Sequence, residues 1–420
     1  MRKRVLMLAY FFPPATSGGV LRTTKFVKYL RDFGWQSTVI APNWRVAPRG
    51  DVGFGEDIPP ETEVVRAGWA EDWPRIWRLL DQVPYLWRWG RLMRAGLQYP
   101  DACSHWRAAV LAEAQRVLRE KRHQLIYSTS PPVTSHYVAL QLKSEFSLPW
   151  VADFRDPWTD NLLSYHNPWE WRRRIDLRLE HRIHQAADMV VANTRSNHAT
   201  IIEKHRVPPE KVTTITNGYD EADFTQIEAW PGSERFRIMY SGSFYGEYTP
   251  STFLSAFRRF LVEENRPKTV LSLAGDSSAW AHNYVTDPTI LAHLELLGNV
   301  PHRKVCRLLS ECNLLLHVYP KRISYSVPSK LYEYLRSGTP IVAVCDRPSE
   351  VSQLLDETGQ GRVFRHDEID DLTTHLRNCY RQWEKGDIAR RIGCRDGLTL
   401  YSRRNLASQL AGVFDRLLRK

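Results

Sequence analysis

Three charged residues lie within four positions where a buried strand is expected to end. The segment Trp150–Phe154 is apolar apart from Asp153, and Arg155 and Asp156 follow it directly. A carboxylate in such a place can accept a proton, and a neighbouring cation can contact a phosphate. The structural alternative is a local Arg–Asp ion pair that fixes the loop. Asp153, Arg155 and Asp156 are therefore our candidate catalytic residues.

A second group of chemically useful residues lies at the start of a predicted helix. Pro328 suits the first turn of this helix, and Gly338 suits its end. The N–H groups of Ser329, Lys330 and Leu331 would then form an anion site that the charge of Lys330 reinforces. Glu333 follows one turn later, where its carboxylate could accept hydrogen bonds from two ribose hydroxyls. The alternative is a pair of charges on a solvated helix face.

A third candidate is the glycine pair Gly18-Gly19, which lies just before a predicted helix. Glycines at this point allow a ligand to approach the backbone, and a helix N-terminus favours an anion. Neither G-x-G-x-x-G nor G-x-x-x-x-G-K-[ST] is present, which argues against dinucleotide and P-loop sites. A tight turn without a ligand is the simpler interpretation of the pair.

Alternating apolar runs and amphipathic stretches predict the elements that position these residues. The predicted strands are 5–10, 37–41, 63–66, 125–128, 150–154, 189–192, 212–215, 237–241, 270–275, 314–318, 340–344 and 361–364. The predicted helices are 20–33, 132–146, 170–187, 197–205, 252–264, 302–311, 328–337, 349–355, 369–383 and 403–418. This pattern predicts two parallel α/β domains, joined by a linker at about residues 221–235. Ligands then belong at the carboxyl ends of the strands, in a cleft between the domains.

Composition excludes several classes of protein. The 420 residues are 43% hydrophobic and 25% charged, and no apolar run is long enough to span a membrane. The six cysteines are dispersed, which indicates reduced thiols and a cytoplasmic protein. The net charge is +11, and residues 1–200 hold 28 basic and 20 acidic side chains. This excess indicates an anionic partner, but no nucleic-acid-binding motif is visible, so nucleic acid is not expected.

Residues 69–106 interrupt the alternating pattern with a segment rich in tryptophan and arginine. Six of the 15 tryptophans lie there, with arginines between them. We interpret the segment as one or two inserted amphipathic helices. Arginine attracts anionic headgroups and tryptophan prefers the membrane interface, so the segment could contact the inner face of the cytoplasmic membrane. The alternative is an ordinary lid over the sheet.

Taken together and in order, the motifs of nearly the whole chain resemble glycosyltransferase family 4. The Asp153–Trp158 motif is similar to that of a subgroup of bacterial cell-surface sugar transferases. Other matching segments are 5–13, Gly18-Gly19, Pro100-Asp101, Trp106, 130–132, His136, 190–194, 215–220, 297–301, 327–334 and 337–341.

The resemblance implies an α/β protein of the GT-B fold, with two facing Rossmann-like domains, parallel sheets and an interdomain cleft. Residues 1–220 would bind the acceptor, a glycan or lipid-linked molecule. Residues 236–400 would bind a nucleotide-sugar donor, and residues 401–420 would return to the N-terminal domain. The resemblance also implies retention of anomeric configuration and no metal or other cofactor.

The family pattern implies a role for each candidate. Gly18, Gly19 and Gly242 would allow close approach of the substrates, and Glu333 would hold the ribose. On this basis we expect Lys330 with the amides of residues 329–331 to hold the diphosphate. We expect Arg155 to contact phosphate and Asp156 to receive the acceptor proton, with Asp153 lining the same centre.

The chain departs from the family pattern where donor-binding groups are usual. Tyr325 replaces the first glutamate of the E-x7-E motif, and Ser243 and Tyr248 stand where an arginine and a lysine are expected. Arg155 stands where a histidine is common. Missing cations remove charge-assisted bonds to the diphosphate, which Lys330, Arg322, Lys321 or Arg155 would have to replace. The alternatives are a catalytically impaired binding or scaffold protein and a sugar-nucleotide epimerase of similar fold.

Overall fold

The computed structural model describes residues 2–16, 18–45, 53–70, 93, 96–162, 165, 167–225, 232–246, 248–264, 268–386 and 397–419. These residues form two compact units. Unit 1 comprises Met1–Thr216 with Arg403–Lys420, and unit 2 comprises Asn217–Ser402. Most of the tryptophan- and arginine-rich segment 69–106, and with it the predicted membrane contact, lies outside the described residues.

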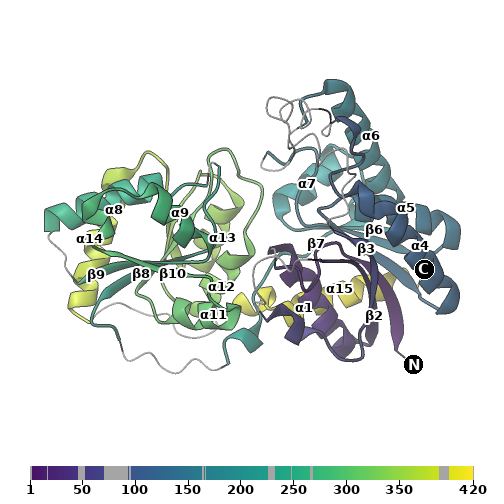
Figure 1. Ribbon diagram of the computed structural model, residues 1–420, viewed down its shortest axis with the longest axis horizontal. Coiled ribbons are helices and arrows are strands. Elements are labelled where there is room, and N and C mark those ends of the chain that lie inside the picture. Colours follow the sequence, from purple (N-terminus) through teal and green to yellow (C-terminus); the bar gives the residue numbers. More distant parts are fainter. Residues whose placement is uncertain are drawn as a thin grey trace. The chain divides into compact units, whose positions relative to one another are not determined.

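Unit 1 is built on a parallel sheet of seven strands in the order β3-β2-β1-β4-β5-β6-β7 (Figure 1). The strands are β1 (Lys3–Leu8), β2 (Trp35–Asn43), β3 (Glu63–Trp69), β4 (Leu125–Ser130), β5 (Trp150–Phe154), β6 (Met189–Ala192) and β7 (Val212–Thr214). Successive side chains of β1 enter opposite cores, with Leu6 and Leu8 in one and Val5 and Met7 in the other. A strand buried on both faces must be apolar throughout, which explains the uninterrupted hydrophobic run.

Helices cover both faces of this sheet. One core receives side chains from α4 (Arg107–Glu120), α5 (Thr134–Phe146), α6 (Glu170–Ala186) and α7 (Arg195–Glu203). The other core receives side chains from α1 (Gly18–Leu30) and from α15 (Arg403–Leu417). The last helix therefore packs beside the first, and Leu406, Leu410 and Phe414 complete the core that α1 begins.

Unit 2 repeats the plan with a parallel sheet of six strands in the order β10-β9-β8-β11-β12-β13. The strands are β8 (Phe236–Ser241), β9 (Thr269–Ala274), β10 (Leu294–Gly298), β11 (Leu314–Val318), β12 (Ile341–Val344) and β13 (Gly361–Phe364). Its helices are α8 (Ser251–Glu264), α9 (Asp276–Tyr284), α10 (Pro288–Leu291), α11 (His302–Ser310), α12 (Ser329–Ser337), α13 (Glu350–Thr358) and α14 (Ile369–Glu384). Aromatic side chains of α8 and α14 pack on β8 in its core.

The predicted α/β class with two parallel-sheet, Rossmann-like units is confirmed. Strand β10 and helices α4 and α9 are present although the sequence pattern did not predict them. The described part of the predicted linker 221–235 begins with a short 3₁₀ helix, Glu221–Asp223, that belongs to unit 2. Among the described residues, none of the helices combines the length and the apolar character that a membrane span requires.

Candidate functional site

Each sheet has a point where the strand order reverses, and the predicted site residues gather at these points. In unit 1 the reversal lies between β1 and β4, and in unit 2 it lies between β8 and β11. Gly18 opens α1 after β1, Gly242 follows β8, and Ser329 opens α12 after β11. Ligands of doubly wound sheets bind at such places, beyond the carboxyl ends of the strands. Each unit thus has a candidate site of its own.

Asp153 of unit 1 is held in a buried network. Arg22 of α1 donates to both of its carboxylate oxygens, at 2.8 and 2.9 Å, and the Tyr127 hydroxyl donates to one of them. Arg22 also donates to the carbonyls of Ile215 and Thr216, so it connects α1 to the segment that follows β7. Burial alone would lower the pKa of Arg22, but the Asp153 carboxylate raises it above the ordinary value. This geometry favours a structural role for Asp153 over the catalytic role predicted from the sequence.

Arg155 lies against the first turn of α1. A Cβ atom built on Gly19 would be 1.9 Å from Nη1 of Arg155, so only glycine fits beside the guanidinium. The guanidinium donates to the carbonyls of Ser130 and Pro131 at 3.0 and 2.6 Å. Among the described residues it has no carboxylate within ion-pair distance, and its burial lowers the pKa of Arg155. A fixed cation therefore faces a helix N-terminus, which is a favourable place for an anion.

Asp156 is half-buried next to this cation. The loss of solvent raises the pKa of Asp156 above the ordinary value, although Arg155 and Arg22 act in the opposite direction. No hydrogen bond to its carboxylate is present among the described residues. A carboxylate with a raised pKa takes up a proton more readily. The role of Asp156 as proton acceptor stays a prediction.

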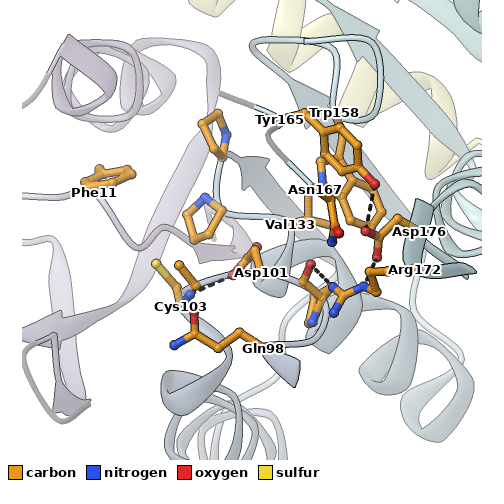
Figure 2. Close-up of a pocket in the computed structure, with 14 residues that line it drawn as sticks. Phe11, Gln98, Asp101, Cys103, Val133, Trp158, Tyr165, Asn167, Arg172 and Asp176 are labelled. Atoms are coloured by element: carbon orange, nitrogen blue, oxygen red, sulfur yellow. Dashed lines mark hydrogen bonds and ion pairs between the residues drawn. The ribbon is translucent and has the colours of Figure 1, made fainter. Parts of the chain in front are cut away.

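A pocket of about 360 Å³ lies at the carboxyl end of the same sheet (Figure 2). Its walls are mostly apolar and include Phe11, Trp158 and three prolines. Figure 2 shows Tyr165 and Arg172 both directed at Asp176, with bonds of 3.0 and 2.8 Å. The pocket lining comprises Phe11, Gln98, Pro100, Asp101, Ala102, Cys103, Pro131, Pro132, Val133, Trp158, Tyr165, Asn167, Arg172 and Asp176.

Asp101, one of the motif residues, lines this pocket and binds the first residue of α5. Its carboxylate accepts from the backbone N–H of Thr134 at 2.8 Å and from the Thr134 hydroxyl at 2.7 Å. It also accepts from the N–H of Cys103 at 2.8 Å. Its burial raises the pKa of Asp101, although these three bonds favour the ionised form. Asp101 therefore joins the pocket to the N-terminus of α5.

In unit 2, two glycines bring the backbone to the carboxyl edge of the sheet without side chains. Gly242 has φ 129° and Gly275 has φ 84°, conformations that other residues rarely adopt. A Cβ atom on Gly275 would lie 3.0 Å from the carbonyl oxygen of Gly242, and one on Gly242 would lie 3.0 Å from Nζ of Lys330. The lysine and the bare backbone thus face the same small space.

Lys330 is packed against Tyr240 of β8. Its ammonium donates to the Tyr240 hydroxyl at 2.7 Å and to the Ser241 carbonyl at 3.1 Å, and lies 3.9 Å from the centre of the Tyr240 ring. Burial lowers the pKa of Lys330 to about 7, although Glu333 acts in the opposite direction. The charge of Lys330 is therefore only partly present near neutral pH, and a bound anion would restore it.

The start of α12 offers two of the three predicted amide donors. The N–H of Leu331 already donates to the carbonyl of Pro328 at 3.1 Å. The N–H groups of Ser329 and Lys330 belong to the first turn and have no carbonyl acceptor within the helix. The predicted anion site therefore reduces to these two amides and the lysine side chain.

Glu333 faces a histidine of the neighbouring helix α11. His302 Nε2 lies 2.9 Å from Oε1 of Glu333, and His302 Nδ1 lies 3.6 Å from Oδ2 of Asp223. Burial alone would lower the pKa of His302, but Glu333 and Cys306 raise it well above the ordinary value. The Glu333 side chain is 10% exposed. Glu333 is therefore a fixed carboxylate with one oxygen bound to a neighbour.

Three residues that depart from the family pattern, Ser243, Tyr248 and Tyr325, have neutral side chains. The Ser243 hydroxyl donates to Asp276 at 3.2 Å, and Tyr248 is buried against Tyr319. Arg322 has φ 67°, is exposed, and donates its backbone N–H to Asp346. Tyr325 is half-buried in the same loop. Of the departures from the family pattern, only Arg155 is therefore charged, and the candidate replacement Arg322 is an exposed cation.

Two family models match consecutive parts of the chain. Residues 17–218 match the glycosyl transferase 4-like domain, and residues 223–392 match the glycosyl transferases group 1. The two matches together span most of the chain and support a glycosyltransferase of the family 4-like type. The expected assignment is thus confirmed at this level, and the Asp153–Trp158 subgroup motif stays a prediction.

The individual proteins that resemble this chain have low sequence identity to it. The chain is 24% identical over 270 residues to the probable glycosyltransferase WbjE of Pseudomonas aeruginosa, a match that spans 60% of this chain and 65% of the relative. The Anabaena protein HepE, solved with UDP and glucose, has a TM-score of 0.66 and 14% identity, over 99% of this chain and all of HepE. WaaG, a glycosyltransferase involved in lipopolysaccharide biosynthesis, has a TM-score of 0.62 and 14% identity, over 98% and 99% of the two chains. At these identities the structural similarity shows the fold of this GT-B protein.

Sequence reasoning missed several residues that complete the two sites. Arg22 and Tyr127 hold Asp153, and Gly275 and Tyr240 surround Lys330. His302 directly follows the matched segment 297–301, and its position at the start of a predicted helix was the available signal. Gly275 ends a predicted strand, which was a further signal, whereas Arg22, Tyr127 and Tyr240 carried none because their partners are distant in the sequence.

Proposed function

We propose that the protein transfers a sugar from a nucleotide-sugar donor to a glycan acceptor. The observation that carries this proposal is the arrangement of Gly242, Lys330 and the start of α12 at the strand-order reversal of unit 2. Two glycines allow close approach of a ligand there, while a lysine and two amides supply positive charge. That combination suits a diphosphate, and it supports a nucleotide-sugar donor held by unit 2.

Each donor-binding residue has a role in this proposal. The diphosphate gains negative charge as the sugar leaves, and Lys330 with the amides of Ser329 and Lys330 would stabilise that charge. Binding would also raise the pKa of Lys330 from about 7, because a nearby anion favours the ammonium. Glu333 would accept hydrogen bonds from the ribose hydroxyls, with His302 fixing its orientation. The Tyr240 ring would hold the lysine in place.

We propose that unit 1 binds the acceptor, a lipid-linked or cell-surface glycan intermediate. The mostly apolar pocket with Phe11, Trp158 and Tyr165 supports this, because aromatic rings offer apolar faces and Tyr165 adds a hydroxyl group. The role of WaaG in lipopolysaccharide biosynthesis supports the same class of acceptor. Asp156 would take the proton of the acceptor hydroxyl, and Arg155 would contact a phosphate.

Nucleotide binding tests the proposal directly. Melting of the purified protein would be measured with UDP, GDP, dTDP and their sugar conjugates, and we expect one nucleotide class to stabilise it. Lys330→Ala and Glu333→Ala should each remove most of this stabilisation and the turnover of the donor. Lys385→Ala, a change of an exposed lysine at the end of α14, should leave both unchanged. Full activity in both site variants would overturn the proposal.

We further propose that transfer retains the anomeric configuration and needs no metal, as the family resemblance implies. Nuclear magnetic resonance of the product would give the configuration of its new glycosidic bond. An inverted product would contradict retention.

A catalytically impaired binding protein is the second candidate. The neutral Ser243 and Tyr248, each with another partner, favour it, because two cations of the family pattern are missing. Such a protein would bind the nucleotide sugar without hydrolysis or transfer. An epimerase would instead convert the donor with no acceptor present, so incubation of the donor alone identifies it. Hydrolysis or transfer of the donor sugar would exclude the binding protein.

A further inference from the structure

Three side chains of different chemistry converge at one end of α11 in unit 2. His302 and Cys306 are four residues apart on this helix, so both lie on the same face. Glu333 reaches the same point from α12. The His302 Nε2 atom lies 2.9 Å from Glu333 Oε1 and 3.9 Å from Cys306 Sγ. One ligand atom from each residue falls within 4.8 Å of the other two.

These separations are close to those of a tetrahedral zinc site. Zinc bonds of about 2.0–2.3 Å to nitrogen, oxygen and sulfur place neighbouring ligand atoms roughly 3.3–3.6 Å apart. The observed 2.9 and 3.9 Å from His302 Nε2 lie on either side of this range, so shifts of a few tenths of an ångström would bring these two pairs into it; the third pair lies within 4.8 Å. Imidazole, thiolate and carboxylate are also the three ligand types that zinc prefers.

A second carboxylate is placed to orient the histidine. Asp223 Oδ2 lies 3.6 Å from the other ring nitrogen of His302, Nδ1, and the Asp223 side chain is buried. Histidines that bind metals usually give their second nitrogen to such a group, which fixes the ring and strengthens the ligand. The cluster thus has three ligands and the outer partner that a metal site uses.

We propose that His302, Cys306 and Glu333 form a binding site for Zn²⁺, and that the bound ion withholds Glu333 from the nucleotide. The second part rests on the proposed function, in which Glu333 holds the ribose. Binding replaces the proton between His302 and Glu333 and the thiol proton of Cys306, and both protons pass to solvent. Water would supply the fourth ligand.

The chain contains a matched control. His375 and Cys379 are also four residues apart on a helix, α14, with their Nε2 and Sγ atoms 3.5 Å apart. Among the described residues this pair belongs to no group of three candidate metal ligands. A site that needs three ligands should therefore form at His302 and not at His375.

Metal titration tests the first part. Zn²⁺ binding would be measured by calorimetry, and Co²⁺ would report a thiolate ligand through its sulfur-to-metal absorption band. Cys306→Ser and Cys306→Ala should each weaken zinc binding at least tenfold and remove the band, while Cys379→Ser should change neither. Circular dichroism would establish that the variants are folded. Equal affinity in all four proteins, or no binding to the unaltered protein, would overturn the site.

A competition experiment tests the second part. The affinity for the stabilising nucleotide would be measured with Zn²⁺ and with EDTA, and zinc should weaken it at least tenfold in the unaltered protein but not in Cys306→Ser. Equal nucleotide affinity with and without zinc would overturn the inhibition. If no nucleotide binds in EDTA, the proposed function fails, whereas the metal titration still decides whether the zinc site exists.

Discussion

Arg155 and Lys330 are the candidate anion-binding cations of the two units, but they hold their charge in different ways. Arg155 lies against the first turn of α1, Lys330 belongs to the first turn of α12, and each faces a glycine that leaves room for it. Arg155 donates to two backbone carbonyls, whereas Lys330 is packed on an aromatic ring. Arginine stays protonated in such a setting, but the pKa of Lys330 falls to about 7.

The difference indicates two kinds of anion site. The charge of Arg155 is permanent, so unit 1 presents it whether or not a ligand is bound. The charge of Lys330 depends on what occupies the site, because an anion there restores the proton. Lys330 would therefore be fully protonated only while the diphosphate of a donor is bound beside it.

The largest effect is expected in unit 1, from the loss of the buried Arg22–Asp153 ion pair. Arg22→Met leaves Asp153 buried without its partner, which typically costs about 3–5 kcal/mol of unfolding free energy. Hydrogen exchange should become faster in peptides of unit 1, with those of unit 2 as an internal reference. Arg182→Met, at an exposed position of α6, should have no such effect. Equal protection in both variants would show that the Arg22–Asp153 pair does not hold unit 1.

Because the charge of Lys330 depends on pH and on a bound anion, nucleotide affinity should depend on pH. The pKa of Lys330 is about 7 in the free protein and should be higher with an anion bound, so binding takes up a proton. Affinity should be constant below pH 7 and fall by up to about tenfold per pH unit above it, until the bound pKa is reached. Calorimetry in buffers of different ionisation enthalpy would count the proton.

Lys330→Met is the control for this pH dependence. Its nucleotide affinity should be weak and flat across the same range, and the unaltered protein should approach it at high pH. A slope that survives in Lys330→Met would assign the proton to another group.

A smaller effect is expected when Arg155 is displaced. Gly19→Ala places a Cβ atom 1.9 Å from the guanidinium, which must move, but the helix itself tolerates alanine. We expect roughly tenfold lower turnover, as for a weakened charge-assisted bond, and a loss of about 1–3 kcal/mol of unfolding free energy from overpacking. Gly412→Ala on α15, where nothing lies within 4 Å, is the matched control. Equal turnover in the two variants would show that the position of Arg155 does not affect the reaction.

The smallest effect concerns metal. Removal of metal ions with EDTA should leave sugar transfer unchanged or slightly faster, because the proposed mechanism uses the Lys330 ammonium and helix amides in place of a metal ion. A loss of activity that Mg²⁺ or Mn²⁺ restores would contradict that mechanism.

The fold was predictable where burial leaves a local mark. Strands such as β1 and β5 are covered on both faces, so their hydrophobic runs are continuous and easily recognised. Strand β10 lies at the sheet edge and is only half-buried, so Glu295 and the exposed Leu296 blur its pattern. Helix α4 buries only Val110, Ala114 and Val117 among mostly polar neighbours, and was missed for a similar reason.

The sites were predictable only in part. The closeness of Lys330 and Gly242 was predictable, because helix starts and glycines carry local signals. The partner of Asp153 is Arg22, 131 positions away, and no spacing rule relates the two. Without that partner, Asp153 looks like a free carboxylate in the sequence, and it was assigned to catalysis. Long-range pairs of this kind become visible only in the folded chain.

The position of α15 has a consequence for the order of synthesis. The hydrophobic face of unit 1 that α15 covers is translated first, yet its cover, Arg403–Leu417, follows all of Asn217–Ser402. At about 5–20 residues per second, the ribosome needs roughly ten to forty seconds to make the intervening unit. During that interval Phe26, Val27 and the neighbouring strands lack part of their packing, so we expect this apolar face of unit 1 to stay partly exposed until synthesis ends.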